Sequence, residues 1–531
     1  MRGSLFFVCL LFSLAVALDN GLARTPQMGF NSWNYYYCNV NETHMANAMD
    51  DIVNLGLDKL GYNYVVVDDC WALRERDAQG NMQSDPKSFP HGMKVLADRA
   101  HSKGLKFGLY SSAGYTTCAG RAASLGHEKQ DAKLWASWGV DYLKYDNCDR
   151  GDVPAKKRYG DMRDALAATG RTIFYSICSW GTDGVAQWGA QYGNSWRTTD
   201  DIYNGQDAVT YNIVANDVDA AYAAPGGWND PDMLRIGNGG QPIGLDRIQF
   251  GLWSLAKAPL ILSCDLLKLS QKQLDVIRNT EVIAVNQDAL GIQGRLVYDS
   301  PNQYQIWAGK QSNGDQVVAV VNLQSAGATL RLPFNLLKFA PSAQLKIRSL
   351  WDHSDLGIFS EGLDVKVAGR DCVMLRLTPV IDVSDKIFRL QPKGLPGGMR
   401  PSDQNNVNGN VETGSWNSEA RMKWKVLDAG DGYVYLVEQK NGFYLDLQGG
   451  QTAVETSATT FTFTGHDSTK WKIVASPEPN YYKIINKASG FVLDSYKCNE
   501  VGENPGGFAG GFIKTWYDVN TPCQQWLFVP V

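Results

Sequence analysis

Eight apolar, strand-like segments recur through the first 270 residues and constrain the fold of this chain more than any other feature. They are QMGFNSW (27–33), YNYVVVDDCW (62–71), KFGLYSSAG (106–114), DYLKYDNC (141–148), TIFYSICSW (172–180), SWRTTDDI (195–202), GGWNDPDML (226–234) and PLILSCDL (259–266). Successive segments are spaced by the length of one strand, a crossover helix and two loops, as from Asp69 to Tyr110 or Asp201 to Asp232. The pattern predicts a (β/α)8 barrel over residues 18–292.

An open, doubly wound sheet is the alternative for alternating strands and helices. A dinucleotide-binding sheet of that kind carries a G-x-G-x-x-G turn after its first strand. Here the glycine-rich stretch GNGGQPIG (237–244) lacks the third glycine and follows the seventh segment. The sequence therefore favours the closed barrel, in which the active site lies at the carboxyl ends of the strands.

Side chains able to do chemistry stand at those strand ends. Lys144 and Asp146 are two residues apart in DYLKYDNC, so both lie on one face of the strand. Charges buried in a strand are costly unless they are paired or put to chemical use. The ends of the other segments hold Trp33, Asp68, Asp69, Tyr110, Cys178, Asp201 and Asp232. We expect these residues to share one pocket.

Beyond the barrel, strands follow each other without helices between them. An antiparallel β-sandwich over residues 293–380 is predicted by QYQIWAG (303–309), QVVAVVNL (316–323), ATLRLPF (328–334) and CVMLRLTP (372–379). From residue 385 the chain repeats itself, since YVYLVEQKNGFYLDLQG (433–449) resembles YYKIINKASGFVLDSYK (481–497). Three such units over residues 385–531 favour a β-trefoil, with an unrelated all-β module as the alternative.

The first residues have the pattern of a secretory signal peptide over residues 1–17. Arg2 precedes an apolar run (5–14) and the small-x-small sequence Ala-Val-Ala (15–17). The run is shorter than the roughly 20 residues that span a membrane, so a membrane anchor is the weaker alternative. We expect a secreted, extracellular protein with no membrane partner, in which Asn41 of the sequon Asn41-Glu42-Thr43 is a candidate glycosylation site.

Charge and histidine placement argue against several classes of function. A formal net charge of −5 without a basic block disfavours a nucleic-acid partner. The six histidines are scattered and none forms a spacing typical of metal ligands, although clustered aspartates leave Mg²⁺ or Ca²⁺ as a weaker alternative. No G-x-S-x-G nucleophile turn is present. We predict no metal and no cofactor.

Several carboxylates at strand ends, with Trp and Tyr around them, are the equipment of glycoside hydrolysis. One carboxylate attacks the sugar or activates water, while another protonates the leaving oxygen. Aromatic rings can pack against the apolar face of the sugar. A single Asp in a loop more often caps a helix, but Asp at five strand ends is not explained by capping.

Six motifs occur in order at barrel spacing: NGLARTPQMGFNSW, DDCW, GLYSSAG, KYDNC, WRTTDDI and GGWNDPDML. Through them, residues 20 to about 380 resemble glycoside hydrolase family 27, the family of α-galactosidases. The resemblance implies a barrel followed by an antiparallel β-domain. It also implies a retaining enzyme that removes terminal α-linked galactose by double displacement from oligosaccharides, polysaccharides or glycoconjugates.

The resemblance assigns a role to each motif. Asp146 is the nucleophile, and Asp201 is the general acid and base. Lys144 binds substrate hydroxyls and, as a nearby cation, is expected to hold the pKa of Asp146 low. Arg197 holds a hydroxyl near the nucleophile. The other substrate-binding residues implied are Trp33, Asp68, Asp69, Tyr110, Cys118, Cys178, Trp180, Asp232 and Met233, of which the aspartates of DDCW bind the hydroxyls on carbons 4 and 6.

Cysteine positions carry a second set of implications. The resemblance places disulfides between Cys38 and Cys70 and between Cys118 and Cys148, the latter beside the site. A bridge between Cys498 and Cys523 is the hypothesis for the C-terminal module. These pairings leave Cys178, Cys264 and Cys372 as free thiols.

One departure from the family concerns recognition at carbon 2 of the sugar. Ser179 stands where many α-galactosidases carry Glu or Asn, and small residues there accompany acceptance of a 2-acetamido group. Trp180, followed by Gly181, instead matches the plant and fungal α-galactosidase pattern, in which the ring fills that space. We predict that Trp180 excludes the acetamido group. An α-N-acetylgalactosaminidase, a β-L-arabinopyranosidase and a catalytically inactive carbohydrate-binding protein are the alternatives.

The C-terminal repeat resembles ricin-type carbohydrate-binding modules less closely. Gln524-Gln525-Trp526 is a Q-x-W motif, while the other two copies keep only the tryptophan, at Trp424 and Trp471. We expect these three rings in the core of the module. The resemblance implies Asp446 and Asp494 as sugar ligands, with Trp516 as a stacking ring.

Overall fold

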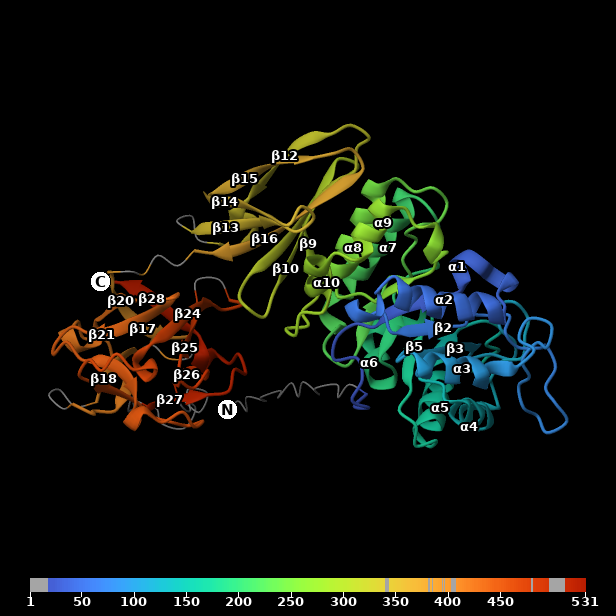
Figure 1. Ribbon diagram of the computed structural model, residues 1–531, viewed down its shortest axis with the longest axis horizontal. Helices are drawn as coiled ribbons and strands as arrows, with labels where there is room; N and C mark the ends of the chain where they lie inside the picture. The colour runs from blue at the N-terminus through green and yellow to red at the C-terminus, as the bar shows by residue number, and fades with distance from the viewer. Residues whose placement is uncertain are drawn as a thin grey trace, which may run out of the picture.

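The computed structural model describes residues 18–339, 343–380, 383, 385–393, 395, 397–402, 407–478, 481–495 and 511–531. Three regions follow each other along the chain (Figure 1). A helix-covered barrel comes first, in blue and green. An antiparallel β-region in yellow follows, and a second all-β region in orange and red ends the chain.

Eight parallel strands form the barrel, and each lies inside one of the eight predicted segments. They are β1 (Met28–Asn31), β2 (Tyr64–Val66), β3 (Lys106–Ser112), β4 (Tyr142–Asp146), β5 (Phe174–Ile177), β6 (Ser195–Arg197), β7 (Trp228–Asp230) and β8 (Leu260–Leu262). Their order in the sheet is β7-β6-β5-β4-β3-β2-β1-β8. A parallel bridge between Leu234 and Leu262 joins the segment after β7 to β8 and closes the ring.

Helices connect the strands and cover the outside of the ring (Figure 1). They are α1 (Trp33–Tyr36), α2 (Glu42–Asn54), α3 (Gly92–Ser102), α4 (Glu128–Trp138), α5 (Ala155–Ala167), α6 (Gly189–Tyr192), α7 (Gln206–Val218), α8 (Ile243–Leu255), α9 (Gln271–Ile277) and α10 (Thr280–Asn286). In α2 the apolar side chains Met45, Met49 and Ile52 recur at helical spacing and are buried. Asn41 caps this helix by accepting a hydrogen bond from the His44 backbone N–H at 2.9 Å.

The second region is antiparallel throughout its described residues. A six-stranded sheet has the order β14 (Ser354–Ser360), β13 (Gln344–Ser349), β16 (Asp371–Pro379), β11 (Gln316–Asn322), β10 (Tyr304–Lys310) and β9 (Arg295–Ser300). A separate pair consists of β12 (Ala328–Pro333) and β15 (Gly362–Val367). Val318 and Val320 of the sheet share a hydrophobic cluster with Leu330 and Leu332 of the pair, so apolar side chains fill the space between the two layers.

Helix α8 lies between the barrel and this region. Eleven of its thirteen residues are buried, which a helix with only one covered face could not achieve. Gly251 lies so close to Met374 of β16 that an added Cβ would stand 2.7 Å from its sulfur. Trp307 and Met374 belong to the same hydrophobic cluster as the barrel. The barrel and the six-stranded sheet therefore share one core.

In the described part of the third region, twelve strands follow as three groups of four. They are β17 (Ile387–Pro392), β18 (Gly398–Pro401), β19 (Val411–Gly414), β20 (Trp424–Gly430); β21 (Tyr433–Glu438), β22 (Tyr444–Leu447), β23 (Ala458–Phe461), β24 (Trp471–Ala475); and β25 (Tyr482–Asn486), β26 (Val492–Ser495), β27 (Ile513–Trp516), β28 (Trp526–Pro530). The last strand of each group begins with a fully buried tryptophan, as predicted for Trp424, Trp471 and Trp526. Their indole N–H groups donate to the carbonyls of Met399, Leu445 and Leu493 at 2.8–3.0 Å.

Disulfides join Cys38 to Cys70 and Cys118 to Cys148, as predicted. Cys178, Cys264 and Cys372 are free and buried, also as predicted. Cys498, the predicted partner of Cys523, lies outside the described residues. Among the residues that the structure describes, no helix has both the length and the apolar character to cross a membrane.

Candidate active site

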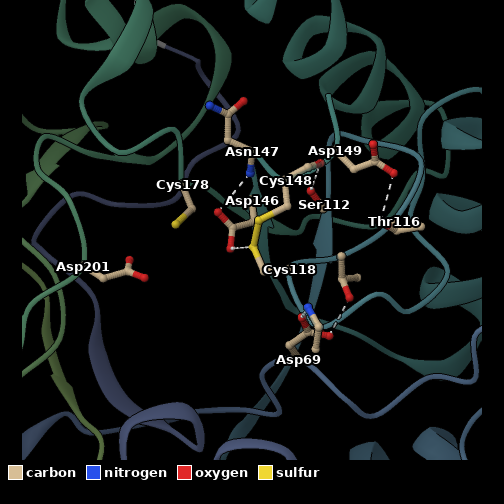
Figure 2. The surroundings of a disulfide bond; sticks show 12 residues. Asp69, Ser112, Thr116, Cys118, Asp146, Asn147, Cys148, Asp149, Cys178 and Asp201 are labelled. Carbon is tan, nitrogen blue, oxygen red and sulfur yellow. Dashed lines mark hydrogen bonds between the residues drawn. A yellow bond between two sulfur atoms is a disulfide. The ribbon is translucent and has the colours of Figure 1, made fainter. Parts of the chain in front are cut away.

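Asp146 is the last residue of β4 and lies at the carboxyl end of the barrel, next to a disulfide (Figure 2). Its Oδ2 accepts a hydrogen bond of 2.7 Å from the Tyr110 hydroxyl on the neighbouring strand β3. Its Oδ1 accepts the Asn147 backbone N–H at 2.9 Å. The Sγ of disulfide-bonded Cys118 stands 3.3 Å from Oδ2. These contacts fix the orientation of a carboxylate that is only 6% exposed.

The prediction of a low pKa for Asp146 is wrong. Burial raises the pKa of this carboxyl, and the opposing effects of Lys144 and of the Tyr110 hydrogen bond do not outweigh it. Lys144 makes its short contact elsewhere, since its Nζ donates to Asp68 Oδ2 at 2.8 Å. The same ammonium lies 5.5 Å from the centre of the Tyr110 ring. Lys144 is thus tied mainly to the β2 end of the pocket.

Asp68 and Asp69 follow β2 and are each 2% exposed. Besides Lys144, Asp68 accepts the Asn31 side-chain amide at 2.7 Å. Asp69 accepts the Thr117 hydroxyl and the Ala119 backbone N–H, both at 2.8 Å. Burial raises the pKa of Asp69. These hydrogen bonds fix the orientation of both carboxylates.

Arg197 ends β6 and organises the opposite side of the pocket. Its Nη2 lies 3.1 Å from Asp201 Oδ1 and 3.2 Å from Asp232 Oδ2. Its Nη1 lies 3.5 Å from the Cys178 sulfur. Figure 2 shows the Asp201 carboxyl pointing across open space toward Asp146, with Cys178 on the same side of the pocket.

The two carboxyls differ in environment. The side chain of Asp201 is 72% exposed, whereas Asp146 is buried. Desolvation in the pocket acts to raise the pKa of Asp201, but Arg197 and Lys144 together lower it below its ordinary value. In the unliganded pocket Asp201 therefore gives up its proton more readily than Asp146.

The remaining predicted residues lie on the loops at the same end of the barrel. Met233 is buried next to Asp232, whose backbone has a positive φ of 84°. Trp33 begins α1 and is half-buried, and its backbone N–H donates to Asn31 Oδ1 at 2.8 Å. Trp180 is half-buried with a φ of 56°, while the neighbouring Ser179 is fully buried.

Two residues that shape the site were not recognised in the sequence, Asn31 and Arg158. Asn31 ends β1 and could have been noticed as a polar side chain at a strand end. Arg158 lies on α5, fully buried, and donates to the Asn147 side chain at 2.8 Å and to the Ala113 carbonyl at 2.9 Å. It supports the loop after Asp146 from outside the strands, where no strand-end motif could reveal it.

In the described ranges, the one group of three residues with metal-type ligand atoms in reach of each other is Cys118, Asp146 and Cys148. The two cysteines form a disulfide, so neither offers a thiolate.

Comparison with known proteins matches this geometry. The family model of α-galactosidase A covers residues 25–288, and that of the α-galactosidase C-terminal β-sandwich domain covers residues 301–377. An α-galactosidase of rice is 48% identical over 364 residues, which are 68% of this chain and 87% of the relative. The chain belongs to the α-galactosidases of glycoside hydrolase family 27. The reaction of this family is the one for which the carboxylate pocket was predicted.

Solved structures agree with that membership. The α-galactosidase I of Mortierella vinacea superposes with a TM-score of 0.65 at 38% identity, over 68% of this chain and 98% of its own. A β-L-arabinopyranosidase of Geobacillus stearothermophilus has a TM-score of 0.62 at 23% identity and shares the fold. In this α-galactosidase, the carboxyl ends of strands β1 to β7 carry the polar side chains of one pocket.

Proposed function

We propose that this chain is a secreted, retaining α-galactosidase in which Asp146 is the nucleophile and Asp201 the general acid and base. The observation that carries the proposal is the arrangement of these two carboxyls. Asp146 is fixed by Tyr110 and the Asn147 backbone, and Asp201 faces it across the pocket. Such a pair supports double displacement when the carboxyls lie about 5–5.5 Å apart, and this separation is the value we predict.

In the first step an Asp146 oxygen bonds to the anomeric carbon as the glycosidic bond breaks. Asp201 gives its proton to the leaving oxygen at the same time. The product of this step is a galactosyl ester on Asp146. In the second step Asp201 takes a proton from water, whose oxygen attacks the anomeric carbon and releases Asp146. Two inversions leave α-galactose as the first product.

Substrate binding has to reverse the order in which the two carboxyls lose their protons. A sugar in the pocket covers the exposed Asp201 carboxyl, and desolvation raises the pKa of a carboxyl. We therefore expect the alkaline limb of kcat, which reports the enzyme–substrate complex, at higher pH than the limb of kcat/KM. In that complex Asp146 ionises first, so the burial that raises its pKa also moves the acid limb of kcat above the ordinary pKa of Asp.

Trp180 is the residue that we propose for discrimination at carbon 2. Ser179 is fully buried and offers no surface to a ligand, whereas Trp180 is partly exposed. Gly181 packs against the Thr198 carbonyl, where an added Cβ would lie 2.4 Å from the oxygen, so the loop cannot easily withdraw. α-Galactosides should be cleaved much faster than α-N-acetylgalactosaminides. Equal rates on the two would remove Trp180 from this role.

Two experiments test the mechanism. Proton NMR of the first galactose released should show the α-anomer, and a β-anomer would exclude double displacement. Asp201→Asn should lose most activity on sugar leaving groups and least on acidic aryl leaving groups, which need no proton. An equal loss on both classes would remove Asp201 as the acid.

The natural substrates that we propose are galactose-containing oligosaccharides, polysaccharides or glycoconjugates. An α-galactosidase of Saccharomyces cerevisiae, 30% identical to this chain, has been solved with raffinose. A raffinose-type oligosaccharide is therefore the first substrate to assay. The secreted location rests on the signal-like residues 1–17 and on the two disulfides of the barrel.

We also propose that the chain divides into a barrel (18–292), a β-sandwich (293–380) and a β-trefoil (385–531) that binds carbohydrate. Three groups of four strands, each with an equivalent buried tryptophan, support the trefoil. Trp516 is half-buried and lies 6.3 Å from the exposed ring of Tyr517, which together could stack on a sugar. On a column of immobilised galactose, binding by the trefoil should delay elution of Asp146→Asn, and Trp516→Ala should lose that delay. Equal elution of the two variants would exclude this binding.

A further inference from the structure

A small cavity lies inside the barrel, between β1 and the strands β4 to β7. Its volume is about 20 Å³. The side chains with polar atoms that line it are Asn31, Tyr142, Lys144, Ser176, Cys178, Arg197, Asp230 and Asp232. A water molecule needs a space of at least about 10–15 Å³ and two to four polar partners, so this cavity has room for one.

One donor at the cavity has bonding capacity that the protein leaves unused. Arg197 is 2% exposed, and its Nε is buried with no hydrogen-bond partner in the described residues. Its Nη atoms, in contrast, contact Cys178, Asp201 and Asp232. An unpaired buried donor is costly, and a bound water is the usual remedy.

Asp230, the last residue of β7, is the anionic side chain opposite Arg197. Its Oδ1 accepts the Asp232 backbone N–H at 2.9 Å, which supports the turn that carries Asp232. Its backbone carbonyl accepts the Thr198 N–H at 2.9 Å and so fixes the chain directly after Arg197. The sequence comparison with the family gave Asp230 no role, although it stands between Asn229 and Pro231 in the GGWNDPDML motif.

We propose that this cavity is a water site, in which one water accepts from Arg197 Nε and donates to Asp230, and that Asp230 is a positioning residue for Arg197. Because Arg197 pairs with Asp201, Asp230 acts through it on the general acid. The proposal rests on the role of Asp201 given above. In this proposal Asp230 does not contact the substrate. It changes how strongly the positive charge of Arg197 lowers the pKa of Asp201.

The groups that face Asp230 decide the sign of this effect. They are Lys144 from β4, Arg197 from β6 and Asp232 from its own loop. Burial raises the pKa of Asp230 to about 6, so it becomes an anion as the pH rises through that value. A negative charge at Asp230 offsets part of the positive charge of Arg197. It thereby raises the pKa of Asp201 and keeps this acid protonated to higher pH.

Asp230→Asn tests the proposal, because the amide keeps the Oδ1 acceptor for Asp232 and removes the charge. With a sugar leaving group, the alkaline limb of kcat, which reports the enzyme–substrate complex, should move to lower pH by about one unit. With an acidic aryl leaving group, which needs no general acid, that limb should not move. Asp246→Asn is the matched control: burial also raises the pKa of Asp246 to about 6, but its partners are Gln241 and Gln273. This control should keep the wild-type limb.

A lower kcat in Asp230→Asn with an unmoved limb would overturn the proposal, since it would show only structural support for the turn. So would a limb that moves equally with both leaving groups or in Asp246→Asn.

A high-resolution crystal structure of the unsubstituted protein gives an answer that does not depend on the variant folding. It should show one water in contact with Arg197 Nε and Asp230, and a dry cavity would overturn the proposal. Asp201→Asn tells these outcomes apart from a failure of the proposed mechanism. If this variant loses most activity with sugar leaving groups and least with aryl leaving groups, Asp201 is the acid and only the role of Asp230 has failed.

Discussion

The barrel and the β-sandwich meet through a shared core, whereas the sandwich and the C-terminal region meet through surface contacts. Trp307 and Met374 of the sandwich are buried in the same hydrophobic cluster as the barrel. The tryptophans of the C-terminal region form a cluster of their own. Contacts across the second joint include the ion pair of Lys310, whose Nζ lies 3.6 Å from the half-exposed carboxylate of Glu478.

The difference indicates which parts depend on each other. Shared apolar burial makes two regions unfold as one, because separating them exposes the area that holds each together. Exposed ion pairs contribute about 1 kcal/mol at most. The barrel should therefore need the sandwich in order to fold, while the C-terminal region should be an independent unit.

Truncation at each joint gives the largest expected effect. A chain ending at residue 292 exposes the sandwich-facing side of α8, which is buried almost along its whole length, and should fail to give soluble active enzyme. A chain ending at Pro379 keeps the shared core and should hydrolyse an aryl α-galactoside at close to the full-length rate. Activity per mole of soluble protein measures both. A soluble active barrel from the first, or an inactive folded protein from the second, would contradict the comparison.

Two buried tryptophans make a matched pair of substitutions. Trp307→Ala and Trp471→Ala each remove a ring that is at most 1% exposed, at a cost of about 3–5 kcal/mol of unfolding free energy. Trp307→Ala should lower the temperature at which activity is lost. Trp471→Ala should leave that temperature unchanged and lower only the unfolding transition of the C-terminal region. Calorimetry combined with activity after heating distinguishes them, and parallel loss of activity in both variants would show that the two units are coupled.

Glu281 makes the shared joint sensitive to pH. This α10 side chain contacts Arg348 and His353 of the sandwich at 2.7 Å, and the Arg348 hydrogen bonds in particular lower its pKa to about 2. The folded state thus holds the ionised form more strongly than the unfolded state does. The gain is present above about pH 4.5 and is lost as the pH falls toward 2.

Glu281→Gln should cost about 1–2 kcal/mol at neutral pH, after allowance for solvent screening, and almost nothing near pH 2. Glu478→Gln, at the other joint, should cost less than about 0.5 kcal/mol at any pH. Urea unfolding of both variants across this pH range measures the difference. A cost for Glu281→Gln that does not change with pH would mean that its charge is not what stabilises the joint.

The sequence could predict the strands and the polar side chains at their carboxyl ends, because strand periodicity and buried charge are local signals. The roles of these side chains were implied only by the resemblance to the family. DYLKYDNC alone places Lys144 and Asp146 on one face at a strand end. The pKa of Asp146 could not be predicted in this way, since it depends on burial by residues from other strands and on Lys144 pairing with Asp68. Arg158 and the cavity at Asp230 likewise arise from packing between segments distant in sequence.

The central claim is that Asp146 attacks the sugar, and covalent trapping tests it most directly. A fluorinated galactoside with a good leaving group slows the release of the glycosyl-enzyme, so the ester accumulates. After proteolysis, mass spectrometry should locate one fluorogalactosyl group on the peptide that contains Asp146, and Asp146→Asn should acquire none. A label on another residue, or none in an enzyme that turns over the unfluorinated substrate, would contradict the role assigned to Asp146.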